Sequence, residues 1–237
     1  MGPRCLVAVI AVLGSAGAGA SPFLMPEGTR EMIIGAVLAN GEEDEGSPTR
    51  STYLQPYLDV RWSNGVFLQG LWLGRQLSAT PGLQYGPLLT LARERTAPPG
   101  RDTRLMPVFG AFARYQLLHN LTFVAHGWRM AGSRGGAVMN LQLVSHHSLA
   151  PHHTLLLAAG ARLADRRHLQ AYLGAGPDAK AGVKDLRAEA RWDWEITPKY
   201  TAGAGVDFTR RQGDAAASPQ VERRSSIGYS LMLLRHF

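Results

Sequence analysis

The chain has 237 residues, of which 45% are hydrophobic and 18% are charged, and its formal net charge is +7. This length allows one large domain or two small ones. Beyond the N-terminal stretch, no apolar run reaches the roughly 18 residues that a membrane-spanning helix needs. The composition therefore excludes a helical membrane protein.

The first 20 residues, MGPRCLVAVIAVLGSAGAGA, have the three parts of a secretory signal peptide. Arg4 gives a basic start, Cys5 to Leu13 form an apolar stretch, and Ala18 to Ala20 match a small-residue cleavage site. We therefore expect residues 1–20 to be a cleaved signal and residues 21–237 to form the mature domain.

Export limits both the cross-links and the partners of the mature chain. Cys5 is the only cysteine, so the mature chain has no disulfide and needs another source of stability. A closed barrel of hydrogen-bonded strands provides one, because it has no free edge. Loss of Arg4 from a net charge of +7 leaves +6. Nucleic acid is not expected as a partner of an exported chain, whereas anionic lipid headgroups are.

The stretch LRAEARWDWEI, residues 186–196, alternates a charged residue with an apolar one along its whole length. A helix would scatter these charges around its axis, whereas a strand places all of them on one face. The segment is therefore predicted to be a strand between two different solvents. These are either water and a soluble core, or the wet lumen of a membrane barrel and lipid.

Alternating segments of about ten residues recur along the chain, and this is the length of a tilted membrane-spanning strand. We therefore predict an all-β fold, a transmembrane antiparallel up-and-down β-barrel of about 12 strands, with 10 as the alternative. The predicted strands are 30–40, 51–62, 66–72, 73–79, 83–93, 105–117, 120–130, 136–147, 153–165, 184–196, 199–210 and 222–237.

The connections between these strands come in two sizes that alternate along the chain. Short turns such as Ser63-Asn64-Gly65 are expected on the periplasmic side, and long loops on the outer side. An even strand number then places both ends of the barrel domain in the periplasm. The long loops are predicted at 41–50, 93–104, 131–136, 166–183 and 211–221.

Two sets of side chains follow from this arrangement. The charged row of the opening stretch should face the lumen, joined by an aspartate of the next strand, so that cross-strand ion pairs could plug a narrow barrel. Aromatic residues at the turn ends of strands should form an interfacial girdle. The lumen row is Arg187, Glu189, Arg191, Asp193, Glu195 and Asp207, and the girdle is Trp62, Trp194, Tyr200 and Phe237.

Catalytic and metal sites are weakly indicated. Asp165 and His168 could form an acid–base pair. The favoured interpretation is a loop whose Arg166, Arg167 and His168 face lipopolysaccharide phosphates. In this loop Leu169 and Tyr172 are expected to pack on the rim of the barrel. No enzyme and no cofactor are therefore expected. A zinc or copper site is a minor alternative, carried by four histidines around one turn, namely His146, His147, His152 and His153.

Three segments resemble the MipA/OmpV family of outer-membrane proteins (MltA-interacting protein). They are LDVRWSNGVFLQG (58–70), ARLADRRHLQAYLG (161–174) and GDAAASPQVERRSSIGYS (213–230), in the family's order and spacing. The resemblance spans most of the mature chain. It implies a barrel of 12 or so strands in the outer membrane of a Gram-negative cell, without catalytic residues. The terminal Phe237 also resembles the signal that the barrel-assembly machinery reads, although Arg235 departs from its usual pattern.

Three functions remain open at this point. The resemblance implies a scaffold in cell-wall metabolism that links a membrane-bound lytic transglycosylase to a murein synthase. A narrow channel for small solutes and a surface adhesin are the alternatives. In each case, outer-membrane lipid and lipopolysaccharide are expected partners.

Overall fold

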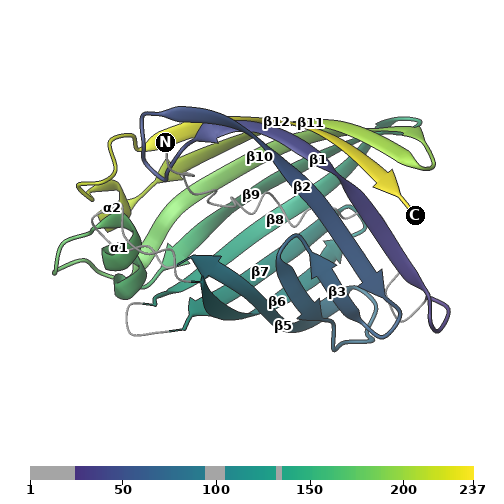
Figure 1. Cartoon of the computed structure of the whole chain (residues 1–237), viewed down its shortest axis with the longest axis horizontal. Coiled ribbons are helices and arrows are strands. Elements are labelled where there is room, and N and C mark those ends of the chain that lie inside the picture. The colour runs from purple at the N-terminus through teal and green to yellow at the C-terminus, as the bar shows by residue number, and fades with distance from the viewer. Residues whose placement is uncertain (1–24, 94–104, 132–134) are drawn as a thin grey trace.

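The computed structural model describes residues 25–93, 105–131 and 135–237. The predicted signal peptide and most of the predicted loop 93–104 lie outside these ranges. Within them, twelve antiparallel strands close into a barrel, each paired with its neighbours in sequence, and β12 pairs with β1 (Figure 1). The predicted fold and the count of 12 strands are confirmed.

The strands agree closely with the predicted ranges. The two strands predicted at 66–72 and 73–79 are present but shorter, and no end of the other strands differs from the prediction by more than three residues. The strands are β1 (Arg30–Glu42), β2 (Arg50–Trp62), β3 (Val66–Gln69), β4 (Trp72–Arg75), β5 (Leu83–Arg93), β6 (Leu105–Leu118), β7 (Leu121–Met130), β8 (Ala137–Ala150), β9 (His153–Ala164), β10 (Gly182–Thr197), β11 (Tyr200–Arg211) and β12 (Ser225–His236).

Alternation explains which face of each strand points outward. Large apolar side chains that are 40–67% exposed, such as Leu54 on β2, Phe109 on β6 and Leu231 on β12, occupy one face. Their neighbours in sequence, which are more buried, occupy the other face and line the lumen. This pattern matches a sheet with lipid on one side. No helix in the described ranges is long and apolar enough to cross a membrane.

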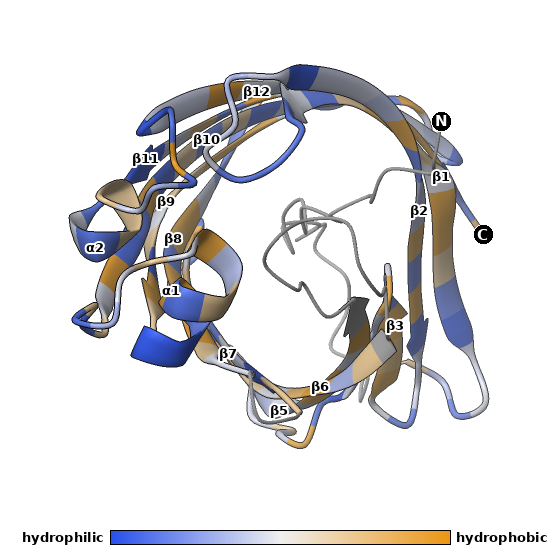
Figure 2. Ribbon diagram, turned by 60° about the vertical axis from the view of Figure 1, so that its left-hand side comes forward, coloured by the Kyte–Doolittle hydropathy of each residue, from blue (hydrophilic) through white to orange (hydrophobic). Residues whose placement is uncertain are grey.

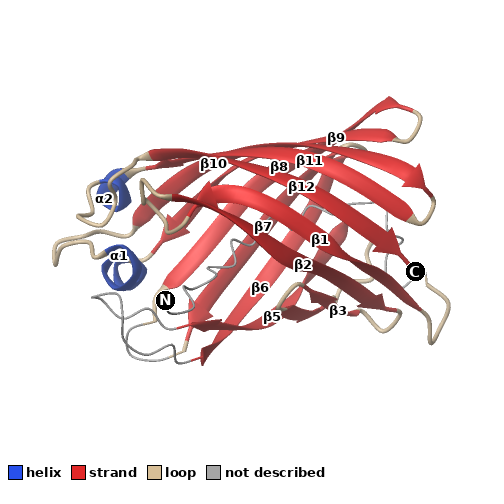
Figure 3. Cartoon of the chain, turned by 45° about the horizontal axis from the view of Figure 1, so that its top comes forward, coloured by secondary structure: helices blue, strands red, loops and turns tan. Residues whose placement is uncertain are grey.

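The two ends of the barrel differ. One end carries tight turns, including Ser63-Asn64-Gly65, where Gly65 has a positive φ of 82° that suits glycine in the last position of a three-residue hairpin loop. The other end carries the long loops and two short helices, α1 (Arg166–Leu173) and α2 (Gly213–Ala216) (Figure 3). β1 begins and β12 ends at the short-turn end of the barrel.

The hairpin β3–β4 is the shortest part of the wall. β2 pairs with β3 through Asp59, Val60 and Arg61 only, and β4 pairs with β5 through Leu73 and Gly74 only. β3 and β4 pair with each other over four residues, and all remaining neighbouring strands are paired over eight or more. The ladders β2–β3 and β4–β5 are therefore the weakest in the barrel wall.

Candidate functional site

The lumen has an apolar half, built from the inward side chains of β4 to β7. Phe67 packs edge-on against Phe112 with ring centroids 5.3 Å apart, and Trp72 packs against Trp128 at 6.1 Å. Tyr172 of α1 packs on the same group from the long-loop end. Side chains therefore fill this part of the barrel as they fill a protein core. The buried members are Trp72, Leu88, Val108, Phe112 and Met130.

The opposite half is charged and is built mainly from β9, β10 and β11. On β10 the charged residues from Lys184 to Asp193 are buried or partly buried, whereas apolar residues between them such as Leu186 and Trp192 are 45% and 39% exposed. Arg191 pairs with Asp193 at 3.0 Å, two residues further along the same strand. Across the ladder, Glu189 is the register partner of Asp207. The structure thus brings these two carboxylates together on adjacent strands.

Glu195 stands apart from the rest of the predicted row. It lies near the short-turn end, where its carboxylate is 3.8 Å from the imidazole of His152, and both side chains are about half exposed. A pair this exposed adds little stability.

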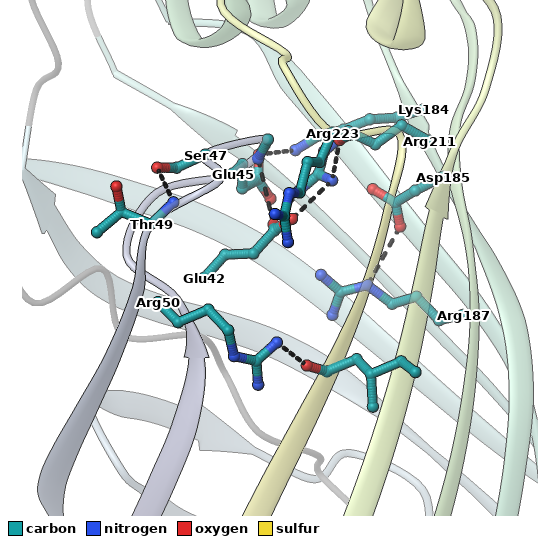
Figure 4. Close-up of polar contacts among 12 residues, drawn as sticks. Glu42, Glu45, Ser47, Thr49, Arg50, Lys184, Asp185, Arg187, Arg211 and Arg223 are labelled. Atoms are coloured by element: carbon teal, nitrogen blue, oxygen red, sulfur yellow. Dashed lines mark hydrogen bonds and ion pairs between the residues drawn. The ribbon is translucent and has the colours of Figure 1, made fainter.

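A cluster of ion pairs joins the loop between β1 and β2 to the far wall at the long-loop end. The carboxylate of Glu45 lies 2.8 Å from Arg162 on β9 and 2.7 Å from Lys184 on β10. Arg162 also pairs with Asp185 at 2.6 Å, and Arg187 pairs with Asp185 at 3.1 Å. We call Glu45, Arg162, Lys184, Asp185 and Arg187 the mouth cluster, and Figure 4 labels all of them except Arg162.

A β-bulge builds the centre of this cluster. The register of β10 against β9 shifts between Val183 and Asp185, so that the successive residues Lys184 and Asp185 are both buried, at 3% and 0% exposure. A regular strand would send one of them to the outer face. The bulge therefore places a cation and an anion side by side in the lumen.

A second contact fastens the same loop to the connection between β11 and β12. Arg211 donates hydrogen bonds to the carboxylate of Glu42 and to the backbone carbonyl of Arg223. The carbonyl of Gly46 accepts from the N–H groups of Glu222 and Arg223, at 2.9 and 3.0 Å. The β1–β2 loop is thus held across the long-loop mouth at both of its flanks (Figure 4).

The segment 166–173 is the helix α1 and not an irregular loop. Leu169 and Tyr172 pack against the barrel as predicted, whereas the predicted outward position of His168 is wrong. Asp165 caps α1 by accepting from the N–H of His168 at 2.7 Å, and Gly174 ends the helix with φ of 64°. The capped helix turns His168 inward, where it is 8% exposed and lies 3.3 Å from the ammonium nitrogen of Lys184. His168 therefore faces the mouth cluster, whereas Arg166 and Arg167 remain exposed.

Two side chains outside the strands, Glu45 and His168, have shifted pKa values. Burial raises the pKa of the Glu45 carboxyl, but Lys184 and Arg162 outweigh it and hold this pKa well below its usual value. Burial, together with the charge of Lys184, lowers the pKa of His168 to about 3. At neutral pH the mouth cluster therefore contains an ionised Glu45 and faces a neutral His168.

The predicted aromatic residues lie at the short-turn end of their strands. Trp194, Tyr200 and Phe237 are 40%, 40% and 57% exposed on the outer face, and Trp62 is partly buried. The guanidinium of Arg235 lies 4.4 Å from the ring centroid of Phe237 and 5.9 Å from that of Tyr200. A cation stacked on such rings can reach the headgroup region, which accounts for an arginine at this position.

The four histidines do not converge. His146 and His147 are successive residues of β8 and point to opposite faces, and His147 contacts the hydroxyl of Ser145 at 3.2 Å. His153 stacks on Trp192 and Trp194 with centroids 5.6 and 6.0 Å away. Within the described ranges, no group of three or more His, Cys, Asp or Glu side chains is placed to hold a metal ion.

The structural likeness extends to known membrane barrels (Figure 2 shows the barrel from another direction). A bacterial polysaccharide outer membrane secretin shares 10% identity over 90% of this chain and 100% of that chain, with a TM-score of 0.56. The NanC porin (10% identity, 86% and 98% coverage, TM-score 0.47) and the Pseudomonas putida toluene transporter TodX (10%, 94% and 93%, 0.44) are more distant. A search of curated protein sequences finds no match.

A family model matches nearly the whole barrel. The model is described as MltA-interacting protein MipA, and it matches residues 34–237. The match begins within β1 and ends at Phe237, so it covers most of β1 and the whole of β2 to β12. The chain is an outer-membrane β-barrel protein and belongs to the MipA family.

Proposed function

We propose that this barrel is a non-enzymatic interaction platform that holds cell-wall enzymes at the inner face of the outer membrane. The observation that carries the proposal is the packing of one half of the lumen together with the ion pairs at its long-loop mouth. Aromatic residues such as Trp72 and Phe112 occupy one half, and Glu45 is tied to Arg162 and Lys184 across the long-loop mouth. A barrel filled in this way is suited to presenting its surface rather than to passing solutes.

The partner that the family name implies is MltA, the lytic transglycosylase, and the resemblance adds a murein synthase. The enzymes work on the periplasmic side, so they would dock on the short-turn face. This requires the long loops and the mouth cluster to face the exterior. The exposed Lys199 of the β10–β11 turn marks the first face, and the exposed Lys180 before β10 marks the second.

Site-specific cross-linking tests the platform. A photo-cross-linking residue would replace Lys199 in one variant and Lys180 in a matched variant, both in native outer membranes. We expect a lytic transglycosylase to be captured through position 199 and not through position 180. Capture through position 180 alone, or of no cell-wall enzyme through either position, would contradict the proposal.

Cysteine labelling tests the orientation of the barrel separately. An introduced cysteine can be labelled selectively, because the mature chain is expected to contain no cysteine of its own. A membrane-impermeant maleimide should label Lys180→Cys in intact cells, and should label Lys199→Cys only after the outer membrane is permeabilised. The reverse pattern would overturn the orientation and leave the fold untouched.

A narrow solute channel is the second candidate, and the charged half of the lumen favours it. Asp207 is inward-facing by its register with Glu189 and yet exposed, so solvent reaches this part of the lumen. Planar-bilayer recordings decide between the two functions. A large and steady conductance of the purified protein would support the channel and count against a filled barrel.

A further inference from the structure

A polar patch lies on the outer face of β1, β2 and β12, at their long-loop ends. Below it the same face carries the exposed side chains of Leu38, Leu54 and Leu231. Asn40 is the register partner both of Thr52 and of Tyr229, so these three side chains share that face. The patch therefore lies where the apolar band of the barrel ends and lipid headgroups begin.

Arg50 is held in a fixed position in this patch. Its guanidinium donates to the side-chain oxygen of Asn40 at 3.0 and 2.6 Å, and to the carbonyl of Ile227 at 2.7 Å. It also lies 5.9 Å from the centroid of the Tyr229 ring. Each of these hydrogen-bonding partners is neutral. Glu42 is the register partner of Arg50 in the β1–β2 ladder, but it forms its ion pair with Arg211 (Figure 4).

A pocket of about 420 Å³ opens beside this arginine. Its lining includes a second arginine, Arg223, and the serines Ser225 and Ser226, of which Ser225 shares the outer face with Ile227 and Tyr229. The exposed Phe208 and the ring of Tyr229 add apolar surface on the side of the lipid band. The pocket thus has a cationic, hydrogen-bonding part and an apolar part in the order of a lipid headgroup and its chains.

The charge balance of the pocket favours an anion. Glu42 is the one carboxylate in the lining, and it is engaged by Arg211 on the lumen side. Arg210 and Arg224, which flank the pocket in sequence, are exposed. Guanidinium groups bind phosphate oxygens through paired, charge-assisted hydrogen bonds, and an aromatic ring offers a flat face to a sugar.

We propose that this pocket binds the phosphorylated sugar headgroup of an outer-leaflet glycolipid, the chemistry that lipid A provides. Arg50 and Arg223 contact a phosphate, the hydroxyl of Ser225 binds the sugar, and an acyl chain lies along Phe208 and Ile227. The inference rests on the proposed orientation, in which the long-loop end faces the exterior.

Binding of defined lipids to the purified barrel in detergent tests this site. Native mass spectrometry would compare the wild type with R50Q/R223Q, using diphosphoryl lipid A as the probe. We expect at least a tenfold loss of affinity in the variant, because each lost charge-assisted contact accounts for about one power of ten. The matched control is R129Q/R167Q, which removes two exposed arginines from the long-loop end on the β7 and α1 side. It should bind as the wild type does.

Three results would overturn the proposal. One is equal loss of affinity in the two double variants, since a general charge effect would then explain binding. Another is equal affinity for lipid A stripped of both phosphates. The last is equal affinity for phosphatidylglycerol or inorganic phosphate, because neither has the sugar that the pocket is proposed to read. Retained strand content in circular dichroism shows that a variant is folded, and R50K offers a milder second variant that keeps the charge and loses the paired contact.

This test is independent of the platform. A lipid-binding defect in R50Q/R223Q with normal cross-linking through position 199 supports the lipid site whatever the enzyme partner is. Maleimide labelling of position 180 from the periplasm alone would overturn the lipid site and the orientation together, even if lipid binds in detergent.

Discussion

The two halves of the lumen are built on different principles. In the apolar half, Trp72 and Phe112 pack as in a soluble core, so burial itself supplies the stability. In the charged half, Glu45, Arg162 and Lys184 are partly or wholly removed from water, and each depends on its oppositely charged partner. Buried pairs of this kind add little net stability when intact but cost much when broken. The first half therefore resists unfolding, and the second fixes where a loop lies.

The largest effect is expected in the apolar half. Trp72→Ala removes a ring that is 7% exposed and leaves a cavity, which should lower the free energy of unfolding by about 3–5 kcal/mol. Urea titration of the barrel in detergent measures it. Leu73→Ala, the next residue on β4, is a matched control because its side chain is 46% exposed on the outer face, and it should cost less. Equal losses would show that the lumen is not packed.

Breaking the mouth cluster should have the second largest effect. Glu45→Gln leaves Arg162 and Lys184 without their shared carboxylate, and we expect a loss of about 2 kcal/mol, moderated because Glu45 is 24% exposed. The control is Glu43→Gln in the same loop. A double-mutant cycle with Lys184→Met isolates the pair, and a coupling energy near zero would disprove the link across the mouth.

Acid should weaken the mouth cluster through His168 in particular. Its pKa is lowered from 6.5 to about 3 in the folded state, so the unfolded chain binds a proton first. The stabilising contribution is complete above pH 6.5 and is lost as the pH falls from 6.5 towards 3. The depressed pKa of Glu45 acts in the same direction at lower pH. The wild type should lose more stability between pH 7.5 and 4.5 than His168→Gln does, and parallel losses would contradict this.

The smallest effect is expected deeper in the charged half. Asp207 is exposed to the lumen, so Asp207→Asn should change the free energy of unfolding by no more than about 0.5 kcal/mol. The same urea titration measures it. A loss as large as that of Glu45→Gln would mean that the whole charged half, and not only the mouth, is a coupled network.

Local patterns were enough to predict the wall of the barrel but not its contents. The alternation of β10 is visible in any ten residues, and it predicted the strand and its outward tryptophans. β6 is apolar on both faces, with Phe109 outside and Phe112 inside, so alternation could not show that the lumen beside it is filled. The capped helix α1 had local signals in Asp165 and Gly174 that the loop interpretation overlooked.

The mouth cluster was beyond prediction for a different reason. Glu45 and Arg162 are 117 residues apart, and the segment GEEDEG carries several acidic residues with nothing in the sequence to single out one of them. The choice depends on the bulge at Val183–Asp185 and on the shape of the mouth, which form only when the barrel closes.

The short hairpin β3–β4 has a mechanical consequence. Under mechanical load or heat, a closed β-barrel opens where neighbouring strands share the fewest residue pairs. Here the hairpin β3–β4 connects β2 to β5, with three residue pairs to β2 and two to β5. Pro56 on β2 has no N–H to donate to a neighbouring strand, and proline is typical of strands that are weakly paired on one side. Unfolding should therefore begin with the separation of the β3–β4 hairpin from its neighbours. The closed barrel would then become a curved open sheet with β2 and β5 as its edge strands.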